Sequence, residues 1–528
     1  MRRWNGWGDE REHAELPEAA ARLLERVVGP GTPPRDATLA DVVAHVPGSR
    51  LDDDPLLSTD PEDRVRHARG QSLHDWIDVR TGRLEAVPDA VARPHDGEQV
   101  RALLRLAAGT GAVLIPYGGG TSVVGGVSVR PSERPVITVD LGRLSGIRGL
   151  DERSGLVTVG AGTTGPRLDT ELAADGWTVG HEPQSWELAT VGGWVAARGA
   201  GLRSLGHGRI EALFAGGTLE APAGTLTMPT HPASAAGPDI RQLVLGSEGR
   251  LGILTDIVLR ASPVPEADVV DAHALPSWDA GMEAARAVAQ LRPGLSFVRL
   301  STPTETQSIL AMAEHPGQVR ALRSYLGVRR VPKGWSLLLV GASGRRRPTR
   351  AAARDAAAIV GRHGAVGVPG LAASWRRGRF RAAYLRNTLW EAGYASDTLE
   401  TATDWTRLPE VARSVAQTLR HGLDDEGERV HVFSHLSHVY PSGSSLYVTY
   451  LYRVATDPDE TLDRWRTLKT AASEAIVAAG GTISHHHGVG VDHAAYLTAE
   501  KGELGMAALR SAIRTFDPDG VMHPGVLV

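Results

Sequence analysis

The stretch Pro116-Tyr117-Gly118-Gly119-Gly120-Thr121-Ser122 follows the apolar run Ala112–Ile115 and decides how this part of the chain folds. The apolar run predicts a buried strand, and the three glycines then remove every Cβ from the turn. Backbone N–H groups in such a turn approach a ligand closely, and Thr121 and Ser122 add hydroxyls. The stretch therefore predicts either a nest for a phosphate or pyrophosphate or a glycine-rich hairpin turn.

The order of elements around this stretch separates two kinds of nucleotide site. Asp96 caps a helical pattern that Gly109 and Gly111 end, so the order is helix, strand, glycine loop. A Rossmann site runs strand, glycine loop, helix. Beyond the loop, residues 123–127 and 136–140 read as strands rather than as a helix. The chain therefore predicts a fold other than the Rossmann fold.

Three further glycine-rich segments follow the first, at residues 155–162, 190–201 and 246–252. Each lies next to a short strand pattern, and the small residues at 196–201 leave room for a large flat group. Four such segments separated by short strands favour one extended cofactor over four unrelated turns.

Length and composition limit the classes of protein to which the chain can belong. A chain of 528 residues predicts two or more domains, and a net charge of −4 argues against a nucleic-acid partner. The absence of cysteine excludes disulfides, thiolate metal sites and a cysteine-linked cofactor. The N-terminus lacks the apolar region of a signal peptide, and no run of about 18 apolar residues occurs, so a cytoplasmic location is expected.

The second notable stretch is Ser484-His485-His486-His487-Gly488-Val489-Gly490. A short strand at 482–484 is predicted to deliver the histidines, and neighbouring residues of a strand point to opposite faces. At most two imidazoles then share a face, which argues against a three-histidine metal site, so no metal is predicted. Proton transfer is favoured instead, because histidine titrates near neutral pH.

The strand pattern at 445–452 contains three tyrosines, and Tyr447 and Tyr450 fall on opposite faces of it. On spacing alone each is a packing residue. Tyr447 becomes a usable base only if cations lower its pKa, and the histidines with an arginine are the expected source of that charge.

The three longest glycine motifs resemble one flavoprotein class. Pro116–Ser122, then Glu182-Pro183 with Thr190–Gly193, then Gly246–Thr255 are similar to the FAD-binding domain of vanillyl-alcohol-oxidase-type proteins. The resemblance implies an α+β fold: a two-subdomain PCMH-type FAD-binding domain plus an α+β cap that binds substrate. It implies non-covalent FAD, since the first loop has Tyr117 and no histidine or cysteine, and His181 is the nearest residue for a covalent link.

Domain bounds and cofactor contacts are carried over from this resemblance. The expected parts are an N-terminal helical region at 1–90, the FAD-binding domain at 91–262, the cap at 263–500, and a segment at 501–528 that returns to the FAD-binding domain. The expected FAD-binding residues are Pro116, Tyr117, Gly118, Gly119, Gly120, Thr121, Ser122, Gln184, Ser185, Trp186, Thr190, Gly192, Gly193, Ala197, Arg198, Gly199, Ala200, Glu248, Gly249, Arg250, Leu251, Gly252, Ile253 and Leu254.

A narrower resemblance runs nearly end to end. The chain is similar to the alkyldihydroxyacetonephosphate synthase family, flavoenzymes of ether-lipid synthesis. The motifs that carry this are Trp4-Asn5-Gly6-Trp7-Gly8, Gly180-His181-Glu182-Pro183, Val191-Gly192-Gly193-Trp194-Val195, Val298-Arg299-Leu300, Tyr384-Leu385-Arg386, Leu446-Tyr447 and the triple-histidine stretch.

The family implies an exchange of the acyl chain of acyl-dihydroxyacetone phosphate for a fatty alcohol, through a flavin N5 adduct and without net redox change. Tyr447 matches the family's acid/base, and His485, His486 and His487 match its active-site histidines. Arg386 matches the substrate-binding arginine, which suits a phosphate ester because a guanidinium is a permanent bidentate donor. Arg299 matches a further arginine needed for activity, acting on the substrate or on the structure.

Two other functions stay open. An FAD-linked oxidoreductase acting on a 2-hydroxy acid or alcohol is the alternative on the same scaffold, because Val521-Met522-His523-Pro524-Gly525 resembles the ending of FAD-linked 2-hydroxy-acid dehydrogenases. A non-catalytic flavin- or lipid-binding protein is the third class, against which Tyr447, Arg386 and the histidines argue. The expected partner is a phosphorylated lipid or small molecule; peripheral membrane contact and a homodimer stay open.

Overall fold

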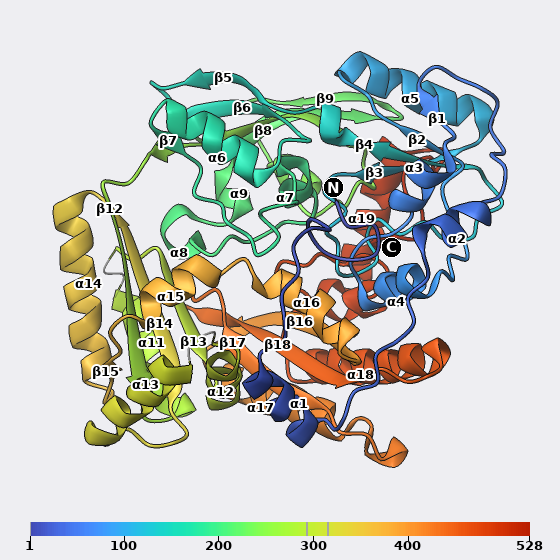
Figure 1. Cartoon of the computed structure of the whole chain (residues 1–528). Helices are drawn as coiled ribbons and strands as arrows, with labels where there is room; N and C mark the ends of the chain where they lie inside the picture. The colour runs from blue at the N-terminus through green and yellow to red at the C-terminus, as the bar shows by residue number, and fades with distance from the viewer. Residues whose placement is uncertain (1, 292–293, 314–315) are drawn as a thin grey trace.

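The computed structural model describes residues 2–291, 294–313 and 316–528, and its strands form three main sheets. Figure 1 places the four-stranded and five-stranded sheets together at one end of the molecule and the seven-stranded sheet at the other. Helices and strands both occur along the whole chain, as the predicted α+β class requires.

The first sheet has the order β1-β2-β4-β3, and it carries the first glycine loop at the end of β3. Its strands are β1 (Leu57–Ser58), β2 (Ala90–Ala92), β3 (Val113–Tyr117) and β4 (Val136–Asp140). β2, β4 and β3 are parallel, and helix α5 (Gly97–Thr110) connects β2 to β3. Asp96 caps that helix by accepting a hydrogen bond from the Gln99 N–H, as predicted.

The second sheet is antiparallel and has the order β5-β6-β10-β8-β9. Its strands are β5 (Ile147–Asp151), β6 (Leu156–Gly160), β8 (Phe214–Ala221), β9 (Gly224–Met228) and β10 (Ile253–Arg260), with a small separate pair, β7 (Trp177–Thr178) and β11 (Ser262–Pro263). Its core takes Leu168 and Leu172 from α6 (Gly165–Ala174) and Val191 and Trp194 from α7 (Val191–Ala196).

The third sheet has seven antiparallel strands in the order β15-β12-β14-β13-β17-β18-β16. They are β12 (Ala267–Leu275), β13 (Phe297–Ser301), β14 (Ser336–Gly344), β15 (Val366–Gly367), β16 (Tyr394–Asp404), β17 (His431–Leu436) and β18 (Gly443–Arg453). One face packs on α11 (Trp278–Leu291), α14 (Arg346–Gly361), α17 (Leu408–His421) and α18 (Pro458–Ala478).

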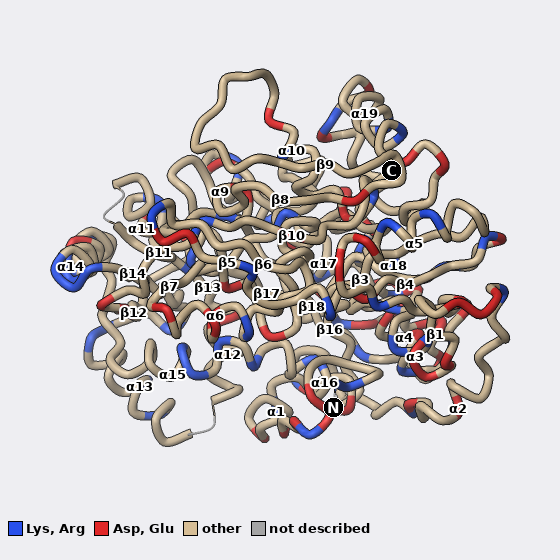
Figure 2. The backbone as a smooth tube through the Cα atoms, turned by 90° about the horizontal axis from the view of Figure 1, so that it is seen from above, with Lys and Arg blue, Asp and Glu red and all other residues tan. Residues whose placement is uncertain are grey.

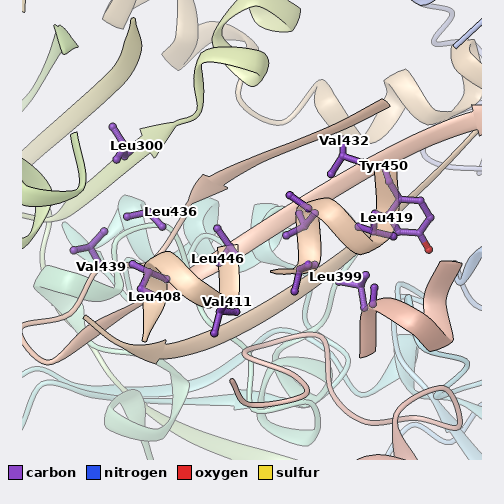
Figure 3. Packing of buried hydrophobic residues seen from close by; sticks show 14 of the residues in the cluster. Leu300, Leu399, Leu408, Val411, Leu419, Val432, Leu436, Val439, Leu446 and Tyr450 are labelled. Atoms are coloured by element: carbon purple, nitrogen blue, oxygen red, sulfur yellow. The ribbon is translucent and has the colours of Figure 1, made fainter. Parts of the chain in front are cut away.

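Apolar side chains alternate along β16, β17 and β18, as strands with one face packed on helices require. Figure 3 shows Leu408, Val411 and Leu419 of α17 beside Leu446 of β18 and Leu399 of β16. Burial of this face stabilises the cap and sends the intervening residues of each strand to the opposite face. The residues of that opposite face include Glu400, Tyr447 and His435, which form the site described below.

The remaining helices bridge the sheets or line the ends of the chain. They are α1 (Glu18–Val27), α2 (Leu39–Ala44), α3 (Pro61–Arg66), α4 (Leu73–Thr81), α8 (Ser204–His207), α9 (Ile210–Leu213), α10 (Arg241–Val244), α12 (Pro303–Ala311), α13 (Pro316–Val328), α15 (Leu371–Gly378), α16 (Ala382–Glu391) and α19 (Leu497–Phe516), with 3₁₀ turns η1 (Leu141–Arg143), η2 (Asp424–Glu426) and η3 (Ala494–Tyr496). Over β12, β13 and β14 the other face of the seven-stranded sheet is covered as well, by α12, α13 and α15.

Both ends of the chain pack onto distant segments. The Trp7 N–H donates to Asn387 Oδ1 at 3.1 Å, and Asn387 Nδ2 donates back to the Trp7 carbonyl at 3.0 Å. At the other end, the Leu114 N–H of β3 donates to the Val521 carbonyl, and the His523 N–H donates to the Leu114 carbonyl. The last residues therefore extend the edge of the first sheet.

Two local expectations are wrong. Residues 123–127 form turns instead of a strand. The N–H groups of Val124 and Gly126 donate to Ser122 Oγ, and the Val124 carbonyl accepts from the N–H groups of Val491 and Asp492, so these groups are not available to a sheet. Residues 482–484 are also irregular: the Thr482 N–H donates to the Ala402 carbonyl of β16, but no regular strand forms.

The distribution of charged residues and the hydropathy of the helices indicate no special surface or membrane-spanning helix in the described part of the chain (Figure 2). Figure 2 shows basic and acidic residues mixed along the backbone, with a run of arginines on the outer helix α14. Among the described residues, no helix has the length and apolar character needed to cross a membrane.

Candidate active site

A pocket of about 330 Å³ lies where the glycine loops of the first two sheets meet. The lining residues are Arg2, Gly118, Gly119, Gly142, Ser145, Gly162, Thr164, Arg167, Leu188 and Thr190. The charged members of this set are both arginines. A cationic pocket walled by glycine backbone suits an anion such as the pyrophosphate of FAD.

At three positions in the wall of this pocket only glycine fits. A Cβ on Gly119 would stand 1.9 Å from the Leu188 carbonyl oxygen, and one on Gly118 would stand 2.4 Å from Thr190 Oγ1. A Cβ on Gly162 would stand 1.8 Å from the Leu141 carbonyl oxygen. Three segments far apart in the sequence thus meet at distances that exclude a side chain, and their residues fit the pyrophosphate part of the cofactor.

Glu248, in the fourth glycine segment, connects the FAD-binding part to the triple-histidine loop. Its carboxylate accepts hydrogen bonds from the Val489 N–H at 2.5 Å and the Gly490 N–H at 2.7 Å. Burial raises the pKa of Glu248 to about 7 even though both hydrogen bonds favour the ionised form. Glu248 has a positive φ of 50°, and the structure holds it there at the contact between the two domains.

The triple-histidine loop converges on one carboxylate, Glu400 of β16. His485 Nδ1 lies 3.2 Å from Glu400 Oε1, His486 Nδ1 contacts Oε2, and His487 Nε2 lies 4.0 Å from Oε2. The expected alternation of the three imidazoles is therefore wrong, because the segment is a loop and not a strand. His438, in the loop between β17 and β18, approaches Glu400 Oε1 at 3.2 Å as well.

Charge in this cluster resides mainly on Glu400. Although burial favours its protonated form, contact with His486 and the hydrogen bonds of His438 and His485 hold the pKa of Glu400 well below its usual range. Burial lowers the pKa of His485 to about 3 and lowers that of His487 well below its ordinary value. Both imidazoles are therefore neutral at physiological pH.

Tyr447 lies in the same row of the sheet as Glu400 and His435, directly opposite each on the neighbouring strands. Its ring stacks on His435, with centroids 4.9 Å apart, and meets the edge of His487 at 5.6 Å. Burial raises the pKa of Tyr447 to about 12. The expected lowering by cationic histidines does not occur, because His487 is neutral, so Tyr447 keeps its proton.

Tyr450, the other tyrosine considered, lies on the opposite face of β18, as predicted. Its hydroxyl donates to Asp397 Oδ2 at 3.0 Å, and Trp465 Nε1 donates to the same oxygen at 2.8 Å. These contacts belong to the core beneath α18, so Tyr450 is a packing residue.

Arg299 reaches Tyr447 only through other side chains. Its Nη2 donates to Glu305 Oε1 at 2.9 Å, and His435 Nδ1 lies 2.8 Å from the same oxygen. Glu305 thus joins Arg299 to the imidazole that stacks on Tyr447. This arrangement favours the structural interpretation of Arg299 over direct contact with substrate.

Arg386 of α16 is held with one donor group spare. Its Nη1 donates to the Gln71 carbonyl at 2.5 Å, its Nε donates to the Ser396 carbonyl at 3.2 Å, and its guanidinium lies 4.1 Å from the centre of the Trp76 ring. Its Nη2 is buried and has no hydrogen-bond partner in the described part of the chain. Asp397, Tyr447 and Tyr450 all lie within electrostatic reach of the Arg386 guanidinium, and burial lowers the pKa of Arg386.

The remaining predicted FAD contacts divide into two groups. The Pro116 ring lies against Gly249, and Thr190 caps α7 by accepting from the Gly193 N–H, which keeps both segments at the pocket. Several others contact protein groups elsewhere.

Four of these residues donate hydrogen bonds to other parts of the protein. The Tyr117 hydroxyl donates to the Arg69 carbonyl, and Gln184 donates to the Arg379 carbonyl. Arg198 donates to Gln242, and Arg250 donates to the Met522 carbonyl. A further three are buried in hydrophobic cores: Leu251, Ile253 and Leu254.

Trp186 connects the FAD-binding part to the cap. Its ring stacks on Phe380 with centroids 5.1 Å apart, and its Nε1 donates to Asp169 Oδ2 at 3.1 Å. Burial, with the nearby charge of Glu182, raises the pKa of Asp169 to about 6.

This raised pKa makes the stability of the protein depend on pH. The carboxyl of Asp169 favours the fold while protonated, so that contribution is lost as the pH rises through about 6. Asp169→Asn is expected to remove this pH-dependent loss of unfolding free energy, which is at most about 3 kcal/mol. The thermal midpoint of Asp169→Asn should exceed that of the wild type by more at pH 7.5 than at pH 4.5. Equal differences at both pH values would contradict the assignment, and the exposed Asp175→Asn is the matched control.

Sequence reasoning missed Glu400, His438 and Tyr440. Tyr440 lies beside the cluster, with its hydroxyl 2.8 Å from His485 Nε2. The sequence did contain a signal for His438, because three histidines, His431, His435 and His438, lie within eight residues just before the tyrosine-rich strand. Glu400 has no such signal, since a single glutamate in a strand pattern does not reveal which loop lies above it.

Comparison with known proteins identifies the family of the chain. Residues 88–228 match the FAD binding domain family, and residues 264–527 match the family described as FAD linked oxidases, C-terminal domain. The alkyldihydroxyacetonephosphate synthase of Dictyostelium discoideum is 27% identical over 100% of this chain and 93% of its own length. That of Trypanosoma brucei brucei is 28% identical over 88% of this chain and 77% of its own length.

A solved structure of alkyldihydroxyacetonephosphate synthase superimposes with a TM-score of 0.84 at 25% identity, covering 99% of this chain and 98% of the other. The match confirms the α+β class with an FAD-binding domain and a cap, and the two matched families confirm FAD as the cofactor. The C-terminal family alone covers half of the sequence, so the chain is an FAD-dependent enzyme that belongs to the FAD-linked oxidase family.

Proposed function

We propose that this enzyme exchanges the acyl chain of acyl-dihydroxyacetone phosphate for a fatty alcohol, a step of ether-lipid synthesis. The observation that carries the proposal is the spare Nη2 of Arg386, a permanently charged, buried donor that lies within electrostatic reach of Tyr447 and has no hydrogen-bond partner among the described residues. A phosphate ester fits that donor because its oxygens accept charged hydrogen bonds. Relatives of this chain that span most of its length are named for the same synthase activity.

The chain's own residues have separate roles in this proposal. FAD, when bound, supplies its N5 atom as the nucleophile for the exchange. Arg386 holds the phosphate of the substrate, and the Tyr447 hydroxyl donates a proton to the departing carboxylate and accepts one from the incoming alcohol. His435 and His487 orient the Tyr447 ring from two sides. The helix-covered sheet behind the tyrosine keeps water from that side.

A direct assay tests the proposal. The purified FAD-loaded enzyme is incubated without oxygen with acyl-dihydroxyacetone phosphate and a long-chain alcohol, and both the released fatty acid and the alkyl product are measured. Equal amounts of the two are expected. Bleaching of the flavin by a 2-hydroxy acid, with no chain exchange, would instead support the oxidoreductase alternative and overturn the proposal.

Arg386→Lys is expected to lower kcat/KM for the phosphorylated substrate about 10- to 150-fold, because one charged hydrogen bond contributes about 1.5–3 kcal/mol. The charge remains, yet lysine lacks the planar fork that reaches both the Gln71 carbonyl and a ligand. The same assay with unphosphorylated acyl-dihydroxyacetone should show a much smaller difference between variant and wild type. An equal loss on both substrates would contradict the phosphate assignment, and Arg413→Lys on the exposed face of α17 is the control.

A further inference from the structure

Four side chains from three separate segments direct ligand atoms at one point. They are Glu400 of β16, His438 of the loop before β18, and His485 and His486 of the triple-histidine loop, and their ligand atoms all lie within 4.8 Å of one another. Glu400 Oε1 lies 3.2 Å from His438 Nδ1 and 3.2 Å from His485 Nδ1. A tetrahedral metal ion with bonds of about 2.0 Å separates its ligand atoms by about 3.3 Å, close to these spacings.

The inward atoms of the cluster contact one another without regular hydrogen bonds. Glu400 Oε2, His485 Nδ1 and His486 Nδ1 are buried and reach no regular hydrogen-bond geometry in the described part of the chain, although His486 Nδ1 contacts Oε2 and His485 Nδ1 lies 3.2 Å from Oε1. Glu400 and His485 are at least nine-tenths buried. Buried polar atoms that gather at one point without regular hydrogen bonds are uncommon, and a bound cation would satisfy them.

Surrounding groups fix the orientation that a metal requires. His485 Nε2 lies 2.8 Å from the Tyr440 hydroxyl, and an N–H donated there leaves the lone pair of Nδ1 directed at the cluster. The Ser437 hydroxyl donates to Glu400 Oε1 at 2.6 Å. Metal-ligating histidines and carboxylates are usually held by such outer hydrogen bonds, which set the tautomer and the ring orientation.

We propose that Glu400, His438, His485 and His486 bind one divalent metal ion of the zinc type. Three imidazole nitrogens and one carboxylate oxygen are a ligand set that zinc accepts in tetrahedral geometry, and no cysteine is needed. The sequence argument against a metal assumed that the histidines alternate along a strand. That assumption fails here, because the loop bends both histidines toward Glu400.

A metal at this point ties the triple-histidine loop to β16 and to the loop before β18. His487, the next residue, then keeps its edge-on contact with Tyr447. The metal proposal does not depend on the proposed reaction, because metal content is measured without substrate. Chain exchange by an enzyme without metal would contradict only the metal site, and bound metal in an enzyme without chain exchange would contradict only the reaction.

The test measures metal content. The full-length enzyme is stripped with a chelator, incubated with Zn²⁺, desalted and analysed by elemental mass spectrometry. One tightly held zinc ion per chain is expected for the wild type, and Glu400→Gln and His486→Ala are each expected to lose it. Cobalt(II) in place of zinc is expected to give the intense visible bands of a tetrahedral site in the wild type and not in either variant.

Controls address unrelated histidines, since the chain has 20 of them. His431→Ala, on β17 and outside the cluster, is expected to keep the zinc ion. Circular dichroism and FAD content establish that each variant is folded. Folded wild type that retains no zinc would overturn the proposal, as would zinc retained in full by both cluster variants, which would place the metal elsewhere.

Discussion

Tyr447→Phe is expected to lower the rate of chain exchange by about 10²- to 10⁴-fold, the range for loss of a positioned acid or base. The substitution removes one oxygen and leaves the ring between His435 and His487, where it keeps both ring contacts. FAD content and thermal midpoint should therefore stay close to those of the wild type. Single-turnover measurement of fatty-acid release gives the rate of the chemical step.

The size of this effect follows from where Tyr447 lies. Burial holds its proton with a pKa of about 12, so the hydroxyl is available as a donor throughout the physiological range. Tyr325→Phe is the matched control and should leave exchange unchanged, because Tyr325 is a half-buried tyrosine of α13 whose hydroxyl donates to the Gly367 carbonyl. A Tyr447→Phe enzyme within threefold of the wild type would remove Tyr447 from the proposed mechanism.

Gly119→Ala is expected to abolish FAD binding. The new Cβ would stand 1.9 Å from the Leu188 carbonyl oxygen and 2.6 Å from its carbon, and both atoms are backbone that cannot rotate away. The first glycine loop and residues 188–190 would have to separate, and both line the same pocket. Flavin absorbance after purification and titration of the stripped protein with FAD measure the effect.

The control for this variant is Gly109→Ala, ten residues earlier on the helix α5. A Cβ there meets no atom within 4 Å, and alanine favours a helix over glycine by about 0.5–1 kcal/mol. Gly109→Ala should bind FAD like the wild type with an equal or higher thermal midpoint. Normal FAD affinity in Gly119→Ala would show that the loop lies away from the cofactor.

Local sequence features predicted much of the scaffold correctly. The Asp96 cap, the helix after it and the strand before Gly118 formed where capping and apolar spacing placed them. The opposite faces of Tyr447 and Tyr450 also followed from spacing. Each of these depends on interactions within a few residues, which the sequence displays directly.

The site beyond the glycine loops depends on contacts between distant segments. Sequence spacing predicted alternating imidazoles, whereas the loop directs His485 and His486 at Glu400, 85 and 86 residues earlier by their numbers. Glu248, predicted to contact the cofactor, also accepts hydrogen bonds from the N–H groups of Val489 and Gly490, which no local pattern indicated. A loop conformation of this kind is set by partners elsewhere in the fold, so no local pattern reveals it.

The sequence by itself determined the glycine loops, the helix caps and the faces of the strands, because each is governed by the steric and hydrogen-bonding properties of neighbouring residues. It also determined the non-Rossmann order around residues 116–122. The folded chain alone reveals that Arg299 bonds to Glu305, that Arg386 Nη2 has no partner among the described residues, and that three histidines gather on Glu400. The physical reason is that burial and long-range packing choose the partners of a buried charge.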